Sequence, residues 1–235
     1  MLKSLPLFRL LSDDQFASLL PSIQRRSYLA RSLVLRAGES AEGLYVILSG
    51  RVTVVIDDGE AREFVVSILG PNEFFGEMGL MEGAPSSVTV ETLEPCEMVY
   101  IPRRRFVECL QTNAGAAMLM LQTALGRLHD AHRKIEGLAL MTVYGRVARV
   151  LIETGRDSNG EWLVDLGTEQ IAAMVGASRE MVSRVLKDMA ESGAVRRDKR
   201  KLIVIDRAFV ADRTRLNGRR LAARSLWGCQ PAESL

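Results

Sequence analysis

Residues 168–187 of the chain, TEQIAAMVGASREMVSRVLK, have the pattern of two short helices that meet at a tight turn. We expect Thr168 to cap the first helix, Gly176 to end it and Ser178 to cap the second. The apolar residues at helical spacing should form the contacts between the helices: Ile171, Ala172, Val175, Val182 and Val185. This layout predicts a helix-turn-helix, a motif that places its second helix in the major groove of DNA.

Polar side chains occupy the exposed first turns of the predicted second helix: Arg179, Glu180, Ser183 and Arg184. Arginine can donate paired hydrogen bonds to guanine O6 and N7, and glutamate can accept from cytosine N4. Serine suits either a base or a phosphate. The sequence therefore predicts that these residues contact bases.

The next stretch, AVRRDKRKLIVID at 194–206, predicts a β-hairpin with a basic tip: Arg196, Arg197, Lys199, Arg200 and Lys201. Such a wing suits DNA phosphates. A basic hairpin in most proteins is a solvated turn, but its place directly after a helix-turn-helix favours a DNA contact. The predicted DNA-binding set is completed by Thr168, Ser178, Arg197, Lys199, Arg200 and Lys201.

Charge is divided unevenly along the 235 residues. Residues 1–140 carry 14 Lys and Arg against 17 Asp and Glu, and residues 141–235 carry 17 against 12. The basic half is therefore the one with the predicted helix-turn-helix, although an excess of this size also occurs on ordinary solvated surfaces.

The N-terminal half has a different pattern, with short β-rich runs between Ser27 and Ile101 that are separated by Gly, Asp, Asn and Pro. This spacing predicts an antiparallel barrel or double-sheet roll. Asp57-Asp58-Gly59 is expected to form a hairpin turn, and residues 5–20, LPLFRLLSDDQFASLL, are expected to be helical before the roll.

Beyond Pro102 the pattern becomes helical, with apolar or small residues at alternating steps of three and four: Met118, Leu121, Leu125, Leu128, His132, Ile135 and Ala139. Three heptads of this kind predict a parallel dimer helix, in which polar His132 fixes the register or marks a wet stretch. The alternative is an amphipathic helix packed against its own domain.

Several other classes of protein fit poorly. No metal-ligand spacing, nucleophile elbow or Walker-type loop is present, so an enzyme is not expected. The sequence lacks a signal peptide or membrane-length apolar run, which predicts a cytoplasmic protein with no membrane partner. Cys96, Cys109 and Cys229 form no CxxC pair and are expected to be reduced structural thiols.

Two motifs make the chain similar to the cAMP receptor protein/FNR family of dimeric regulators, from about Leu7 to Ile205. ASREMVSRVLKDM at 177–189 resembles the family's recognition helix, and GPNEFFGEMGLMEG at 70–83 resembles its phosphate-binding cassette. The resemblance implies a cupin-like β-roll, a dimer helix and a winged helix. It also implies base contacts by Arg179, Glu180, Arg184 and, as in the FNR branch, Ser183, at TGTGA-like half-sites in a palindrome.

The second motif contains the predicted effector site. A Gly-containing loop that leads into a helix suits an anion, and Gly76, Glu77 and Met78 occupy that place. In family members that bind cyclic nucleotides, a glutamate holds the ribose and an Arg-Ser or Arg-Thr pair holds the phosphate. Here the pair is Ser86-Ser87, and the family's adenine-contacting Thr-Ser pair corresponds to Ala131-His132. Both differences point away from cAMP, because a serine hydroxyl does not replace a charged bidentate clamp.

Three alternatives for the sensor stay open: another cyclic nucleotide such as cyclic di-GMP, a different small effector, or no ligand, with Gly76 and Glu77 serving only the turn. An iron–sulfur cluster is not expected without clustered cysteines. Heme is not expected either, because His129 and His132 share one helix three residues apart.

The sequence thus predicts an α+β protein with a cyclic-nucleotide-binding-type β-roll at 1–110, a dimerisation helix at 111–139, a winged helix-turn-helix at 140–212 and a basic tail at 213–235. The predicted function is regulated transcription by a homodimer that binds double-stranded DNA, with RNA polymerase as a further partner. Its recognition helices should lie one DNA turn, about 34 Å, apart. The alternative is a cyclic-nucleotide-binding module that controls a partner protein without specific DNA binding.

Overall fold

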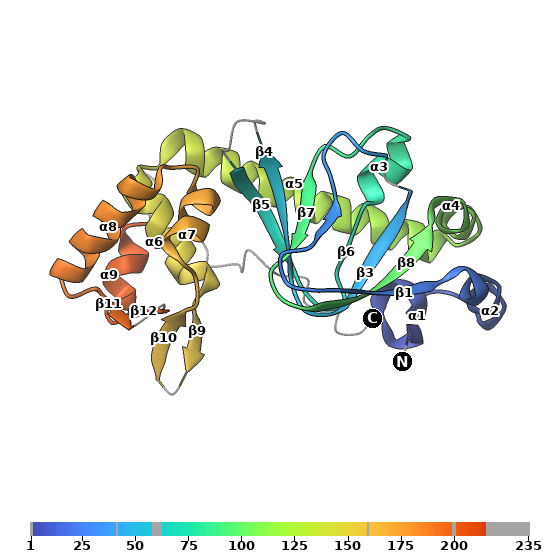
Figure 1. Cartoon of the computed structure of the whole chain (residues 1–235), viewed down its shortest axis with the longest axis horizontal. Helices are drawn as coiled ribbons and strands as arrows, with labels where there is room; N and C mark the ends of the chain where they lie inside the picture. The colour runs from blue at the N-terminus through green and yellow to red at the C-terminus, as the bar shows by residue number, and fades with distance from the viewer. Residues whose placement is uncertain (1, 41, 58–62, 159, 199–200, 215–235) are drawn as a thin grey trace. The chain divides into compact units, whose positions relative to one another are not determined.

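The computed structural model describes residues 2–40, 42–57, 63–158, 160–198 and 201–214. The chain divides into two compact units whose border falls within one long helix, between Leu128 and His129. We call them the N-terminal unit and the C-terminal unit, and each is described by itself (Figure 1).

The N-terminal unit is built on two four-stranded antiparallel sheets, with strand orders β1-β8-β3-β6 and β2-β7-β4-β5. The strands are β1 Gln24–Tyr28, β2 Leu33–Leu35, β3 Gly43–Ser49, β4 Val52–Asp57, β5 Glu63–Leu69, β6 Phe74–Phe75, β7 Thr89–Thr92 and β8 Cys96–Pro102. The β-branched and aromatic residues in these runs suit a pleated, half-buried surface. The double-sheet roll predicted from the sequence is confirmed.

Short helices accompany the sheets, and they are η1 Leu2–Ser4, α1 Pro6–Arg9, α2 Asp13–Leu19, η2 Leu20–Ser22, α3 Glu77–Glu82 and α4 Arg103–Thr112. The expectation of one helical stretch over residues 5–20 is wrong in detail. The Ser12 side chain accepts a hydrogen bond from the Gln15 backbone N–H, and the Gln15 side chain accepts one from the Ser12 N–H. This capping box begins a new helix and separates α2 from α1.

The long helix α5, Ala114–Leu140, has two different apolar faces. On one face Ala116 and Met120 are buried in the core of the N-terminal unit. The other face is the predicted heptad seam, whose large apolar side chains are about half exposed: Met118 54%, Leu121 53%, Leu125 47%, Leu128 49% and Ile135 61%. Among the residues that the structure describes, this stripe is therefore only partly covered, which favours a partner helix over a helix that buries the stripe on its own domain.

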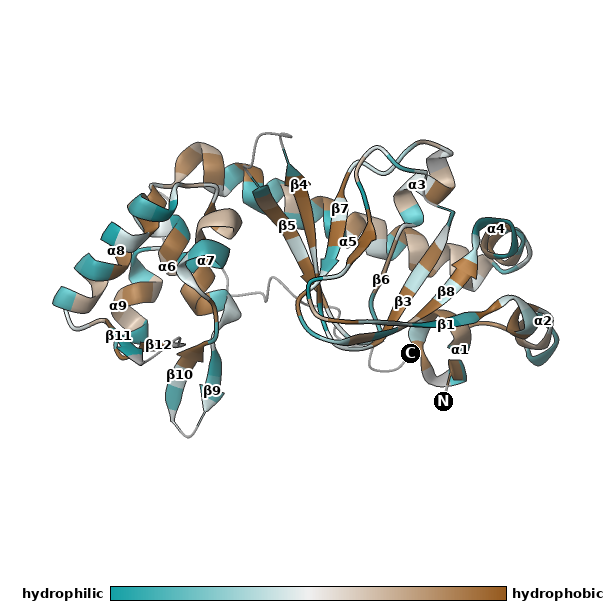
Figure 2. Ribbon diagram, viewed as in Figure 1, coloured by the Kyte–Doolittle hydropathy of each residue, from teal (hydrophilic) through white to brown (hydrophobic). Residues whose placement is uncertain are grey.

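The C-terminal unit joins the end of α5 to helices and a small sheet. Its elements are α6 Val143–Thr154, β9 Arg156–Ser158, β10 Glu161–Val164, α7 Thr168–Val175, α8 Arg179–Glu191, β11 Val195–Asp198, β12 Lys201–Val204 and α9 Arg207–Asp212. The sheet order is β11-β12-β10-β9, so the predicted wing hairpin β11–β12 is confirmed. Figure 2 shows apolar residues throughout this group, and the buried ones form a core of their own.

The α+β fold class with a β-roll, a long helix and a C-terminal helix-turn-helix is thus confirmed. In the described part of the chain, no helix has the length and apolar character that crossing a membrane requires. Some predictions lie outside the described residues: the turn at Asp58-Gly59, the wing tip at Lys199 and Arg200, residues 215–235 of the tail and, with them, Cys229.

Candidate nucleic-acid and effector sites

The helix-turn-helix is formed by α7 and α8. Gly176, which follows α7, has a left-handed conformation with φ 62°, and this ends the helix as predicted. The Ser178 hydroxyl accepts a 3.3 Å hydrogen bond from the Met181 N–H and caps α8, also as predicted. The predicted contacts between the helices are confirmed, because α7 and α8 contact each other and one core cluster contains Ile171, Ala172, Val175, Val182 and Val185.

The predicted cap at Thr168 is wrong. The N-cap of α7 is Gly167, whose N–H donates a 2.9 Å hydrogen bond to the Gln170 side chain. With Gly167 as the cap, Thr168 is the first residue of α7. Its hydroxyl is therefore not used for capping and is available for another contact.

The recognition helix α8 exposes all the predicted base-contacting side chains: Arg179, Glu180, Ser183 and Arg184. Its opposite side holds Val182, Leu186 and Met189 in the core of the unit, which fixes the rotation of the helix. Hydrogen bonds from its own backbone N–H and from the Ser178 hydroxyl hold the pKa of Glu180 below its ordinary value. The carboxylate therefore stays ionised and can only accept hydrogen bonds.

A side-chain hydrogen bond links the wing to the helix-turn-helix. The Arg197 guanidinium on β11 donates a 2.9 Å hydrogen bond to the Thr168 hydroxyl. The structure thereby brings together two predicted DNA-binding residues that are far apart in the sequence. Arg196 instead pairs with Glu161 on β10 at 2.9 Å, and the side chain of Lys201 lies outside the described part.

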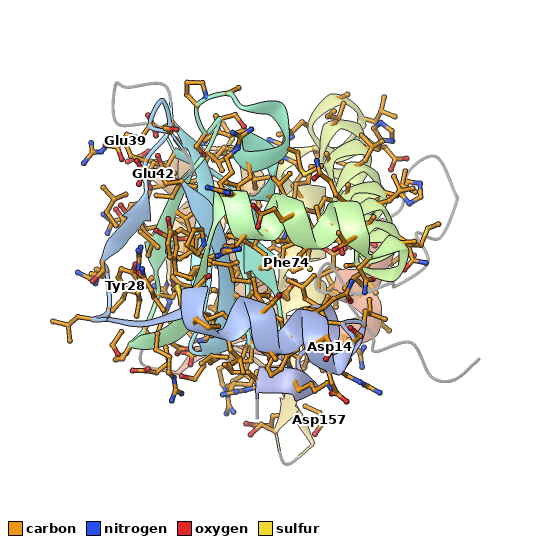
Figure 3. The ribbon with its side chains drawn as sticks, turned by 90° about the vertical axis from the view of Figure 1, so that its right-hand side faces the viewer. Asp14, Tyr28, Glu39, Glu42, Phe74 and Asp157 are labelled. Carbon is orange, nitrogen blue, oxygen red and sulfur yellow. The ribbon has the colours of Figure 1, made fainter. Side chains whose placement is uncertain are left out.

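In the N-terminal unit the predicted cassette surrounds the short helix α3. Gly76 adopts φ 91°, and a Cβ there would lie 2.8 Å from the Gly43 carbonyl oxygen, so the position requires glycine for structural reasons. Glu77 is buried and forms an ion pair with Arg127 from α5. Arg127 also donates to the carbonyl oxygen of Phe74, which is labelled in Figure 3.

Arg127 is a site residue that the sequence reasoning did not identify. It lies 50 positions after Glu77 and on a helix whose apolar seam drew attention to other residues. One available sequence signal is its spacing, because Arg127 follows Ala116 and Met120 at helical steps on the side of the helix away from the seam.

The other predicted effector residues do not form a phosphate clamp. The buried Ser86 hydroxyl donates a 2.8 Å hydrogen bond to the Val88 carbonyl and accepts a 3.3 Å bond from the Val88 N–H. Ser87 and Met78 are exposed. Because the hydroxyl of Ser86 is used within its own turn and carries no charge, this pair does not fit the cyclic phosphate as an arginine pair would.

Ala131 and His132 lie on the part of α5 that belongs to the C-terminal unit, with Ala131 half-buried and His132 exposed along the seam. Near them, α5 and α6 share a group of charged side chains: Asp130, Arg133, Lys134, Glu136, Arg149 and Glu153. Burial raises the pKa of Glu153 to about 7 and lowers that of Lys134 to about 8. Burial thus disfavours the charged forms of these two side chains between α5 and α6.

The described cysteines are free thiols, with Cys96 buried and Cys109 half-buried. Burial raises the pKa of both thiols, which keeps them protonated and poorly nucleophilic. This agrees with a structural role.

Comparison with protein families gives two matches. A cyclic nucleotide-binding domain matches residues 25–113, and a Crp-like helix-turn-helix domain matches residues 145–212. The first range contains the cassette and the second contains both helices of the predicted DNA reader.

Several known proteins are similar to this chain over most of its length. The cAMP-activated global transcriptional regulator Vfr of Pseudomonas aeruginosa is 35% identical over 186 residues, which are 75% of this chain and 87% of Vfr. The cAMP-activated global transcriptional regulator CRP of Haemophilus influenzae is 31% identical over 183 residues, 75% of this chain and 82% of that protein. Among solved structures, the c-di-GMP responsive global regulator CLP of Xanthomonas campestris matches with a TM-score of 0.71 and 29% identity, over 82% of this chain and 99% of CLP.

Proposed function

Since the chain belongs to the cAMP receptor protein/FNR family of transcription regulators, we propose that it binds palindromic DNA as a homodimer through α8. The observation that carries this proposal is the arrangement of α8. Its apolar side is fixed in the core of the unit, while Arg179, Glu180 and Arg184 stand exposed on its first turns.

Base contacts are assigned from the chemistry of these side chains. Arg179 and Arg184 donate paired hydrogen bonds to guanine, and the ionised Glu180 accepts from cytosine N4. Ser183 contacts a base or a phosphate. The expected half-site resembles TGTGA.

Phosphate contacts surround the base-contacting face. The hydrogen bond between Arg197 and Thr168 places a guanidinium at the N-terminus of α7, where the helix dipole also favours an anion. Ser178, Lys199, Arg200 and Lys201 complete the proposed set of phosphate-contacting residues. An Arg197→Ala variant should bind all duplexes more weakly and show a smaller dependence of log K on log salt.

The dimer forms along the exposed seam of α5, from Met118 to Ile135. A parallel pairing of the two helices buries an apolar stripe that the single chain leaves in water. Because a two-fold dimer presents two recognition helices, it matches the symmetry of a palindrome.

The sensor is proposed to respond to an effector other than cAMP. Ser86 stands where a cAMP-binding relative would use a charged clamp, and its hydroxyl is already occupied. Cyclic di-GMP is the first candidate, since CLP is described as responsive to it. We propose no enzymatic activity, a cytoplasmic location alongside the chromosome, and RNA polymerase as the protein partner of the DNA-bound dimer.

A mobility-shift assay tests the proposal with a TGTGA palindrome and a shuffled duplex of the same composition. The wild type should prefer the palindrome. An Arg184→Lys variant should lose this preference, because lysine keeps the charge but not the paired donors. Indifference to sequence would favour a module that controls a partner protein instead. In the same reactions, added cAMP should leave DNA binding unchanged, and added cyclic di-GMP should change it.

A further inference from the structure

Two helix ends meet at the side chain of Arg146, which lies in the first turn of α6. Its Nε donates a 2.7 Å hydrogen bond to the carbonyl oxygen of Val175, the last residue of α7. Its Nη1 donates a 3.0 Å hydrogen bond to the carbonyl oxygen of Met141, the residue that follows α5.

Both acceptors are suited to a cation. The last carbonyls of a helix have no partner within the helix and carry a partial negative charge. Arg146 is half-buried, and burial lowers its pKa. Among the ion pairs of the described residues none involves Arg146, so the two carbonyls compensate its charge.

The planar guanidinium gives this link a fixed direction. Two nitrogens of one rigid group hold two backbone atoms, which a flexible lysine ammonium does not reproduce. On one side, Val175 leads through the left-handed Gly176 to the cap of α8 at Ser178. On the other side, Met141 is buried and donates its N–H to the Gly137 carbonyl at the end of α5.

We propose that Arg146 is a positioning residue for DNA recognition, because it fixes the helix-turn-helix to the end of the dimer helix and thereby sets the spacing of half-sites that the dimer prefers. This inference rests on the proposed function. It assigns no DNA contact to Arg146, which acts through the orientation of α7 and α8.

Binding to a series of duplexes tests it. The duplexes of the series carry the same two half-sites, and their central spacer has its best length or is changed by one or two base pairs. One additional duplex has a single half-site. The proteins are the wild type, Arg146→Gln and Arg146→Lys. Circular dichroism, melting temperature and sedimentation report the fold and the dimer of each variant.

Wild-type affinity should fall by about tenfold or more when the spacer changes by two base pairs, because the recognition helices follow the helical repeat of DNA. In Arg146→Gln this preference should fall severalfold, while affinity for the single half-site stays within about twofold of the wild type. Arg146→Lys should lie between them, because its ammonium keeps a donor but not the fork.

A lower melting temperature with an unchanged spacer preference would overturn the inference, because Arg146 would then serve stability alone. Loss of single half-site binding in both folded variants would also overturn it, since the base-contacting surface itself would be damaged. A wild type without any preference for the half-sites would refute the proposed function, and this inference with it.

Discussion

Replacing Leu125 by alanine should weaken the dimer without disturbing the protomer. Leu125 is 47% exposed in the single chain and occupies the middle of the α5 seam. Full burial of a leucine side chain is worth about 1.5–3 kcal/mol, so covering the exposed half contributes roughly 0.7–1.5 kcal/mol. A two-fold interface contains the residue twice, which gives about 1.5–3 kcal/mol per dimer. The dissociation constant should therefore rise roughly 10- to 150-fold.

Sedimentation equilibrium over a dilution series measures this change. Alanine is a better helix former than leucine, so α5 should stay intact by circular dichroism. Leu20→Ala is the matched control, because Leu20 is 42% exposed but lies outside α5. If Leu125→Ala and Leu20→Ala dimerise with the same affinity as the wild type, the seam is not the dimer interface.

Three further predictions concern the C-terminal unit. The folded-state pKa of Glu153, about 7, lies above the ordinary 4.5, so the folded state holds the proton more tightly and stability falls as pH rises between these values. Urea unfolding at pH 5 and pH 7.5 measures this fall in the free energy of unfolding, which should be smaller in Glu153→Gln than in the wild type by up to about 3 kcal/mol. Asp165→Asn changes an exposed carboxylate and should behave as the wild type. Ser178→Ala should lower the free energy of unfolding by about 1 kcal/mol through loss of the α8 cap, and an unchanged value would contradict that role. Met181 is 44% exposed beside the base-contacting residues and is expected to contact a thymine methyl, the apolar group of the major groove. Uracil in place of one half-site thymine should therefore weaken the binding of the wild type but not that of Met181→Ala.

The fold could be predicted largely from the sequence because its signals are local. A glycine at the end of α7, a serine before α8 and buried apolar residues at helical spacing define the helix-turn-helix within 20 residues. The heptad seam is equally local. The sequence favours Thr168 as the cap because its side chain can accept a hydrogen bond, whereas in the structure the Gln170 side chain accepts from the preceding glycine and makes Gly167 the cap.

The interactions that escaped prediction join residues distant in the chain. The pairing of Glu77 with Arg127 and the two hydrogen bonds of Arg146 depend on how helices pack, which periodicity does not reveal. The raised pKa of Glu153 has the same origin, because burial between α5 and α6 decides it. The absence of an arginine at Ser86 was visible in the sequence, but the use of the hydroxyl within its own turn was not.

The most direct test of the account is the fluorescence anisotropy of a labelled TGTGA palindrome, titrated with the wild type, with an Arg179→Ala/Arg184→Ala variant and with an Arg104→Ala/Arg105→Ala control. The control removes the same charge from exposed positions on α4, so it corrects for nonspecific attraction. We expect the wild type and the control to prefer the palindrome over a shuffled duplex, and the α8 variant to bind both alike, since each paired base contact is worth about 1–3 kcal/mol. A variant that kept the preference would show that α8 does not recognise the operator.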